Sequence, residues 1–187
     1  RIPLIIAGPG VPQGQNINTP VSLLDISPTI LTAMGCKVPE DMRGQDLISF
    51  AENGDKEEKH AVFGEYHANG AVTGEFMVRQ GQWKYIHYEG MRPQLFNIEN
   101  DPNELQDLGE DPDYVEVRER LYQLLHHEFG NLTELDAKIK SYQFNQFKDW
   151  WKSGSIQEKT DIMLEFAGGN LKAIAPYLKM LGGKDEL

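Results

Sequence analysis

Hydrophobic and polar positions change their spacing twice along this chain, and each spacing predicts a different kind of structure. Residues 1–7 form an apolar run, which is typical of a strand covered on both faces in a parallel sheet. Between residues 60 and 100, alternating runs separated by turn dipeptides such as Asn69-Gly70 predict a small antiparallel sheet of about four strands. Beyond residue 110 the apolar positions recur at helical spacing.

The opening run predicts a neighbouring strand that the remainder of the chain does not supply. A parallel strand reaches its neighbour through a crossover connection, and no second buried strand of this kind follows. We therefore expect the 187 residues to be the C-terminal piece of a larger enzyme, whose catalytic residues lie in the missing part.

Capping residues set the expected helix limits. Ser27-Pro28 predicts the start of a helix and Gly35 its end, and a second short helix is expected at residues 46–50. Asp111-Pro112 predicts the start of a longer helix that ends at Gly130. The apolar stripe of this longer helix should pack on the small sheet and consists of Val117, Leu121, Leu124 and Leu125.

The tail from Asn131 onward is too rich in aromatic residues for a disordered segment. Short helices are expected over residues 156–166 and 170–181. The aromatic cluster that precedes them comprises Phe144, Phe147, Trp150 and Trp151. We expect this tail to dock on the body of the protein or on another subunit, so that self-association is predicted.

Charge and composition exclude several kinds of partner. A net charge of −11 and an isoelectric point of about 4.9 argue against nucleic acid and anionic membranes, because both select basic patches. No apolar run approaches the roughly 20 residues of a membrane span. The single cysteine, Cys36, excludes an internal disulfide framework and a zinc site made of thiolates.

Four segments resemble, in order, motifs of the sulfatase family within the alkaline-phosphatase-like superfamily. The run through Gly10 resembles the R-V-P-hydrophobic-G-P-G strand, and residues 19–29 resemble the V-D-hydrophobic-x-P-T helix start. Residues 42–47 resemble the G-x-S/D-L loop. Residues 83–104 are the most specific match, since they resemble the ending W-K-Y-I … L-Y/F-D/N-L-x-x-D-P-x-E. The resemblance covers about residues 1–129 and leaves out the tail.

The resemblance implies an α/β to α+β fold with three parts. Residues 1–59 would end the large α/β sulfatase domain, and residues 60–130 would form a C-terminal antiparallel subdomain with its packed helix. Residues 131–187 would be the helical, aromatic-rich tail. The parent would be a sulfuric ester hydrolase that acts on a small sulfate ester, with a formylglycine nucleophile and a divalent cation, expected to be calcium.

Neither of these two groups is predicted in this chain. Cys36 is followed by Lys37-Val38-Pro39-Glu40, which does not fit the C/S-x-P-x-R motif that is converted to formylglycine. The family's metal-binding Asp-Asn-Gly or Asp-His-Gly is missing as well. We therefore predict no catalytic residue and no metal ligand here. The missing N-terminal domain is the expected partner, and the isolated fragment, as scaffold and pocket rim, should be inactive.

Glu65 and His67 are the predicted substrate-binding residues. They lie two apart at the end of an expected strand, so both side chains face the same way, and a Gly-containing loop follows. The resemblance to choline sulfatases implies a place near a cationic substrate group, to which Tyr66 would add an aromatic face. The alternative is a hydrogen-bonded pair that closes the sheet edge. His87, on a later strand, is expected to be structural.

Two other functions stay open at this point. The parent could be a phosphodiesterase or phosphonate monoester hydrolase of the same superfamily, or the chain could be a stand-alone, non-catalytic oligomerisation module. The compartment is open too. The cytoplasm or periplasm of a bacterium is expected, and the lumen of the endoplasmic reticulum only if Lys184-Asp-Glu-Leu187 acts as a retrieval signal.

Overall fold

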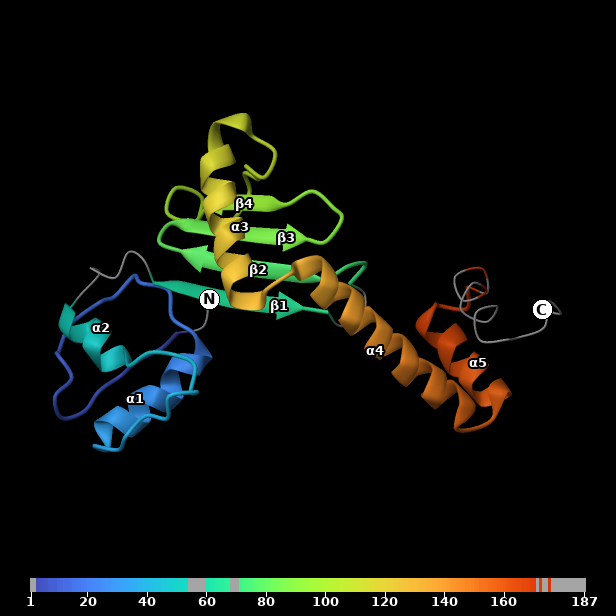
Figure 1. The fold of residues 1–187 in the computed structure, drawn as a ribbon, viewed down its shortest axis with the longest axis horizontal. Helices are drawn as coiled ribbons and strands as arrows, with labels where there is room; N and C mark the ends of the chain where they lie inside the picture. Colours follow the sequence, from blue (N-terminus) through green and yellow to red (C-terminus); the bar gives the residue numbers. More distant parts are fainter. Residues whose placement is uncertain (1–2, 54–59, 68–70, 171, 173–174, 176–187) are drawn as a thin grey trace. The chain divides into compact units, whose positions relative to one another are not determined.

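The computed structural model describes residues 3–53, 60–67, 71–170, 172 and 175. The chain forms two compact units, Arg1–Leu132 and Thr133–Leu187 (Figure 1). The three-part division inferred from the family resemblance stays a prediction.

An antiparallel sheet of four strands organises the first unit, in the order β1-β2-β3-β4 (Figure 1). The strands are β1 (Ala61–Tyr66), β2 (Glu75–Gln80), β3 (Trp83–Tyr88) and β4 (Gln94–Asn97). Gly81 and Gly90 lie in the turns around β3 with φ of 54° and 74°, a conformation that glycine adopts without steric cost. The predicted small sheet is confirmed.

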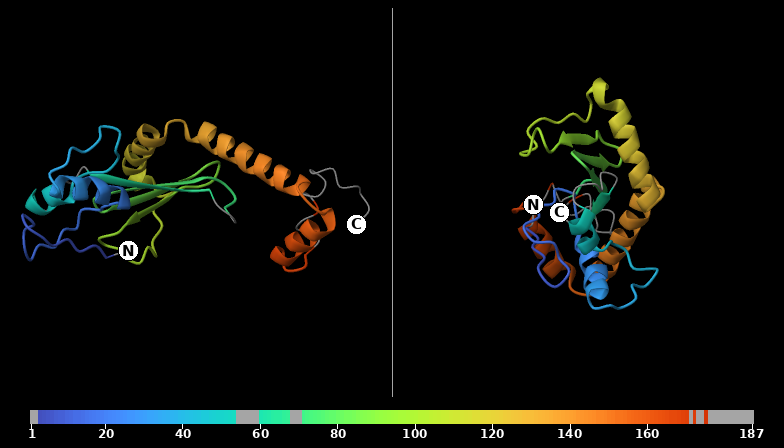
Figure 2. Two further views of the ribbon diagram at one scale, coloured as in Figure 1. Left: turned by 90° about the horizontal axis from the view of Figure 1, so that it is seen from below. Right: turned by 90° about the vertical axis from the view of Figure 1, so that its left-hand side faces the viewer.

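Helix α3 (Val115–Phe129) lies across one face of this sheet, as Figures 1 and 2 show. Leu121 and Leu125 of the predicted stripe are fully buried. They belong to the same core as a cross-strand row on the sheet: Val78, Tyr85 and Leu95. Burial raises the pKa of the Tyr85 hydroxyl to about 12, because the charged phenolate is poorly solvated there.

The limits of α3 agree with the capping pattern. The Asp111 side chain accepts a hydrogen bond from the backbone N–H of Asp113, and a 3-10 turn over Pro112–Tyr114 leads into the helix. Gly130 follows the last residue with φ of 77°.

The predicted opening strand is wrong. The described residues of this run, 3–7, are not in a strand, and Ile5 is 90% exposed. A strand exists only by hydrogen bonding to a neighbour, and in the described part of the chain no segment pairs with this run.

The first helix begins earlier than Ser27-Pro28. Ser22 and Asp25 form a capping box around a 3-10 turn (Leu23–Asp25), which leads directly into α1 (Ile26–Ala33). Gly35, with φ of 69°, follows the helix end as predicted. The expected second helix is present as α2 (Leu47–Asn53).

A helical hairpin makes up the described part of the second unit. Helix α4 (Leu132–Lys152) starts at the last residue of the first unit, and α5 (Ile156–Phe166) follows it. The buried Trp151 packs against Met163, Leu164 and Ala167. The Lys159 ammonium is buried and donates to the backbone oxygens of Trp150 and Trp151, so it caps the carbonyl end of α4.

The tail is thus more helical than expected. The 21-residue α4 was not predicted, whereas α5 confirms the pattern at 156–166. The pattern at 170–181 lies almost entirely outside the described residues, as does the terminal Lys184-Asp-Glu-Leu187. Across the described residues, none of the helices is both long and apolar enough to traverse a bilayer.

Candidate functional site

The aspartate carboxylates in the family-like motifs accept hydrogen bonds from backbone N–H groups. Asp25 is 2% exposed, and its carboxylate accepts the backbone N–H groups of Ser22 at 2.6 Å and Gln45 at 2.8 Å. Thr29 accepts the N–H of Leu47 at 2.9 Å. These contacts attach α1 to the loop before α2, so the V-D-hydrophobic-x-P-T match is explained as a structural element.

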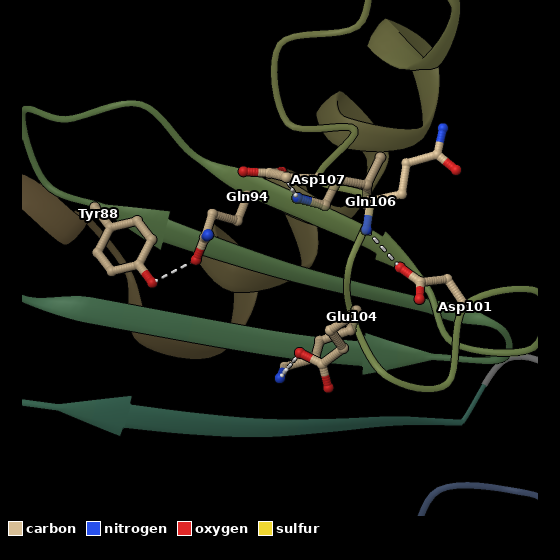
Figure 3. Close-up of polar contacts among 8 residues, drawn as sticks. Tyr88, Gln94, Asp101, Glu104, Gln106 and Asp107 are labelled. Carbon is tan, nitrogen blue, oxygen red and sulfur yellow. Dashed lines mark hydrogen bonds and ion pairs between the residues drawn. The ribbon is translucent and has the colours of Figure 1, made fainter.

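The loop after β4 is built in the same way (Figure 3). Asp101 accepts the N–H of Gln106 at 2.7 Å, and Asp107 accepts the N–H groups of Leu95 at 3.1 Å and Gly109 at 2.9 Å. Glu104 has φ of 56°, unusual for a residue with a side chain. The Lys84 ammonium, 2.5 Å from the Glu104 carboxylate, holds it in place. The carboxylates of the D-P-x-E motif therefore fix the conformation of a loop.

Glu65 and His67 meet at the end of β1, as the sequence predicts. The His67 Nε2 lies 3.2 Å from the Glu65 Oε2. Because an ionised carboxylate can only accept, Nε2 carries the proton in this contact. The His67 side chain is only 14% exposed and packs edge-on against Phe76, whereas the Glu65 side chain is 46% exposed. The exposed carboxylate can accept hydrogen bonds from a ligand, and the imidazole orients it.

A second imidazole–carboxylate pair lies on the same side of the sheet. Glu65, Phe76 and His87 are cross-strand neighbours, so their side chains share one face. The His87 Nε2 is 3.3 Å from the Glu89 carboxylate, and the ring packs against Tyr122 of α3. His87 therefore has packing and hydrogen-bonding partners, in keeping with a structural role.

The sequence analysis did not group these residues as one site. The signal that could have joined them is the repeated spacing: Glu65 precedes His67 by two residues, and His87 precedes Glu89 by two, each at the end of a strand. Strand alternation also separates Tyr66 from Glu65, since successive side chains point to opposite faces. The aromatic ring beside the pair is that of Phe76.

The residues present do not fit a catalytic metal or a formylglycine. In the described ranges, no three His, Cys, Asp or Glu side chains come together in a way that could hold a metal ion. Cys36 is exposed just beyond α1, and its motif lacks the required proline and arginine positions. We derive no catalytic step on this chain from either group.

Comparison with known proteins assigns the fold to a family. The family model described as "N-sulphoglucosamine sulphohydrolase, C-terminal" matches residues 1–130. The chain belongs to this sulfatase family. It corresponds to the C-terminal part of a sulfatase, which confirms the family resemblance of the sequence motifs. The match also places the Glu65–His67 pair inside the sulfatase C-terminal domain.

Curated sulfatases extend the similarity. Arylsulfatase K of Mus musculus is 32% identical over 163 residues, which cover 82% of this chain and 29% of the relative. Arylsulfatase K of Danio rerio is 33% identical over 161 residues, which cover 82% of this chain and 30% of the relative. The chain thus spans about 30% of the length of the curated relatives it matches.

Solved structures support the same fold. BT1596, a 2-O GAG sulfatase, matches 65% of this chain and 28% of its own with a TM-score of 0.57 and 29% identity. The phosphonate monoester hydrolase of Silicibacter pomeroyi matches 68% of this chain and 28% of its own with a TM-score of 0.53, but at 19% identity. The second likeness shows the fold alone.

The Asp101 carboxylate gives the loop after β4 a pH-dependent stability. Its pKa is held below the ordinary value by backbone hydrogen bonds, first of all from Gln106 and then from Leu105. A carboxyl group whose pKa is lowered in the folded state stabilises that state at pH values above its pKa in the unfolded chain, about 3.9. This stabilisation is lost as the pH falls through the pKa of the folded state. Asp101→Asn should therefore lower the free energy of unfolding at pH 7, and the deficit should shrink below about pH 4.

Urea unfolding at pH 7 and at a pH below about 4 measures this effect. Glu99→Gln, which neutralises an exposed carboxylate of the same loop, serves as the matched control and should change little. A deficit of equal size at both pH values would show that Asp101 does not act through its charge.

Proposed function

We propose that this chain is the non-catalytic C-terminal portion of a sulfuric ester hydrolase, in which it serves as scaffold and substrate rim. The observation that carries the proposal is the family match over residues 1–130, together with relatives of about three times its length. The parent acts on a small sulfate ester. The formylglycine nucleophile and the divalent cation, with calcium as our specific proposal, reside in the N-terminal portion, where the cation supplies Lewis-acid stabilisation of the sulfate oxygens.

The exposed apolar surface of the opening segment supports the scaffold role. Ile5 is 90% exposed and Leu23 is 72% exposed, and Leu4, Leu24, Ile30 and Met34 are exposed beside them in sequence. Such a concentration of large apolar side chains marks an interaction surface. Its occupant is the N-terminal portion of the sulfatase, whose strands pair with the opening run.

The Glu65–His67 pair supplies the rim. Its accessible group is a carboxylate, which repels sulfate and accepts hydrogen bonds from hydroxyl or ammonium donors. Glu65 therefore contacts the uncharged or cationic part of the substrate, while His67 holds the carboxylate in position beside the substrate. The likeness to a phosphonate monoester hydrolase shows only the fold, so the sulfate ester is the substrate we propose.

The scaffold role predicts that altering the apolar surface weakens binding to the N-terminal portion. Ile5→Asp combined with Leu23→Asp should weaken binding of the chain to a separately produced N-terminal portion by at least about tenfold, since each side chain contributes about 1.5–3 kcal/mol when buried. Co-purification and titration calorimetry measure the affinity. Leu105→Asp, at an 84% exposed position in the loop after β4, is the control and should bind like the unaltered chain.

The proposed contact between Glu65 and the substrate gives a further prediction. In the full-length enzyme, Glu65→Gln should reduce kcat/KM for a hydroxyl- or ammonium-bearing sulfate ester by about 10- to 100-fold, mainly through KM, because a hydrogen bond to a charged group is lost. Hydrolysis of a plain aryl sulfate should change less. Glu116→Gln, exposed in the first turn of α3, is the matched control. Equal losses on both substrates would show that Glu65 acts on folding alone.

A further inference from the structure

Helix α4 presents two different faces, of which α5 covers one. The covered face contains Trp151, which is 7% exposed and packs against residues of α5. Tyr142 lies nine residues earlier, or about two and a half turns, so it points to the opposite side of the helix. There it is 65% exposed. Among the described residues of the second unit, α5 therefore covers the Trp151 side of α4 and leaves the Tyr142 side exposed.

This second side carries an apolar stripe. Leu135, Ile139 and Tyr142 follow one another at spacings of four and three residues, which places them on one line along the helix; Leu135 and Ile139 are half-buried and Tyr142 is exposed. Trp150 lies at the edge of the stripe two turns later; it is 38% exposed, and the Lys159 ammonium of α5 lies 5.2 Å from its ring centroid. Four large apolar or aromatic side chains at these spacings form the pattern with which helices pair.

The charges that flank the stripe specify its partner. Lys138 and Asp149 are both exposed and lie on nearly the same side of α4, but eleven residues, or about 16 Å, separate them along the axis. They cannot pair with each other within one helix, although Lys138 lies four residues after Glu134 and Asp149 three residues before Lys152. Glu134 and Lys152 lie farther out, 18 residues or about five turns apart, and so share one line. In each of the two couples, Lys138–Asp149 and Glu134–Lys152, the acidic and the basic residue lie at similar distances along the helix on either side of Gln143.

A two-fold axis at Gln143 brings these charges together. If a second copy of α4 lies antiparallel on the stripe, Lys138 meets Asp149 of the other copy and Glu134 meets Lys152 of the other copy. Each contact occurs twice, as an isologous dimer requires. In a parallel pair, the flank that carries these charges would lie on opposite sides of the interface in the two copies, so the two couples would not meet.

We propose that α4 is a self-association surface whose partner is a second copy of this chain in antiparallel orientation. The apolar stripe supplies the buried contact, and the flanking charges set orientation and register. The proposal goes beyond the sulfatase function and does not depend on it, because the surface is in the second unit and outside residues 1–130 that match the family.

A charge exchange on the full chain tests the proposal. Lys138→Asp and Asp149→Lys should each weaken dimerisation by about tenfold, because two attractive contacts become two repulsive ones. The double variant, which restores opposite charges across the axis, should return to within about threefold of the unaltered chain. Sedimentation equilibrium measures all four affinities without reference to enzyme activity.

Cross-linking tests the orientation. In a Cys36→Ser background, chains with Lys138→Cys and chains with Asp149→Cys are mixed and treated with a short bismaleimide. The mixed dimer should be the main product, while Glu158→Cys on α5 serves as the control that gives little product.

Four outcomes would overturn the proposal. The chain could be monomeric, which would leave the stripe to another part of the protein. Association could be indifferent to the charge variants, which would assign it to the apolar opening segment. The double variant could be as weak as the singles, or cross-links could join like positions, which would exclude the antiparallel pair.

Discussion

The physical constraint that governs this structure is the apolar surface of residues 4–34. Ile5 is 90% exposed and Leu23 is 72% exposed, and burying such a side chain is worth about 1.5–3 kcal/mol. The opening run has backbone groups that need a neighbouring strand as well. Such a surface is typical of one part of a larger fold. The match to the sulfatase C-terminal family supports this interpretation, and we propose that the N-terminal portion covers the surface.

Several polar residues hold the domain together, whereas the Glu65–His67 pair leaves a carboxylate accessible. Asp25, Asp101 and Asp107 each bind backbone N–H groups, and Lys159 binds backbone carbonyls. These groups are committed to holding loops and helix ends. The Glu65 carboxylate, with its imidazole support, stays accessible at a strand end, which is why it is our candidate for contact with the substrate.

Local signals in the sequence were sufficient for the sheet and for α3, because alternation, Gly turns and the Asp111-Pro112 start act over a few residues. They failed for the opening strand, because a strand needs a hydrogen-bonded neighbour and no described segment pairs with residues 3–7. They also failed for α4, where dense aromatic residues indicated a docking cluster rather than a long helix. Glu65 and His67 were found by parity along one strand, whereas Phe76 and His87 join them only through the register between strands.

The most direct measurement is the hydrolysis of an aryl sulfate by the N-terminal portion alone, by this chain alone and by the two together. The account predicts turnover only when both parts are combined, with an aryl phosphonate hydrolysed more slowly. An N-terminal portion that reaches full activity by itself would contradict the scaffold role of this chain, and a preference for the phosphonate would contradict the sulfatase function.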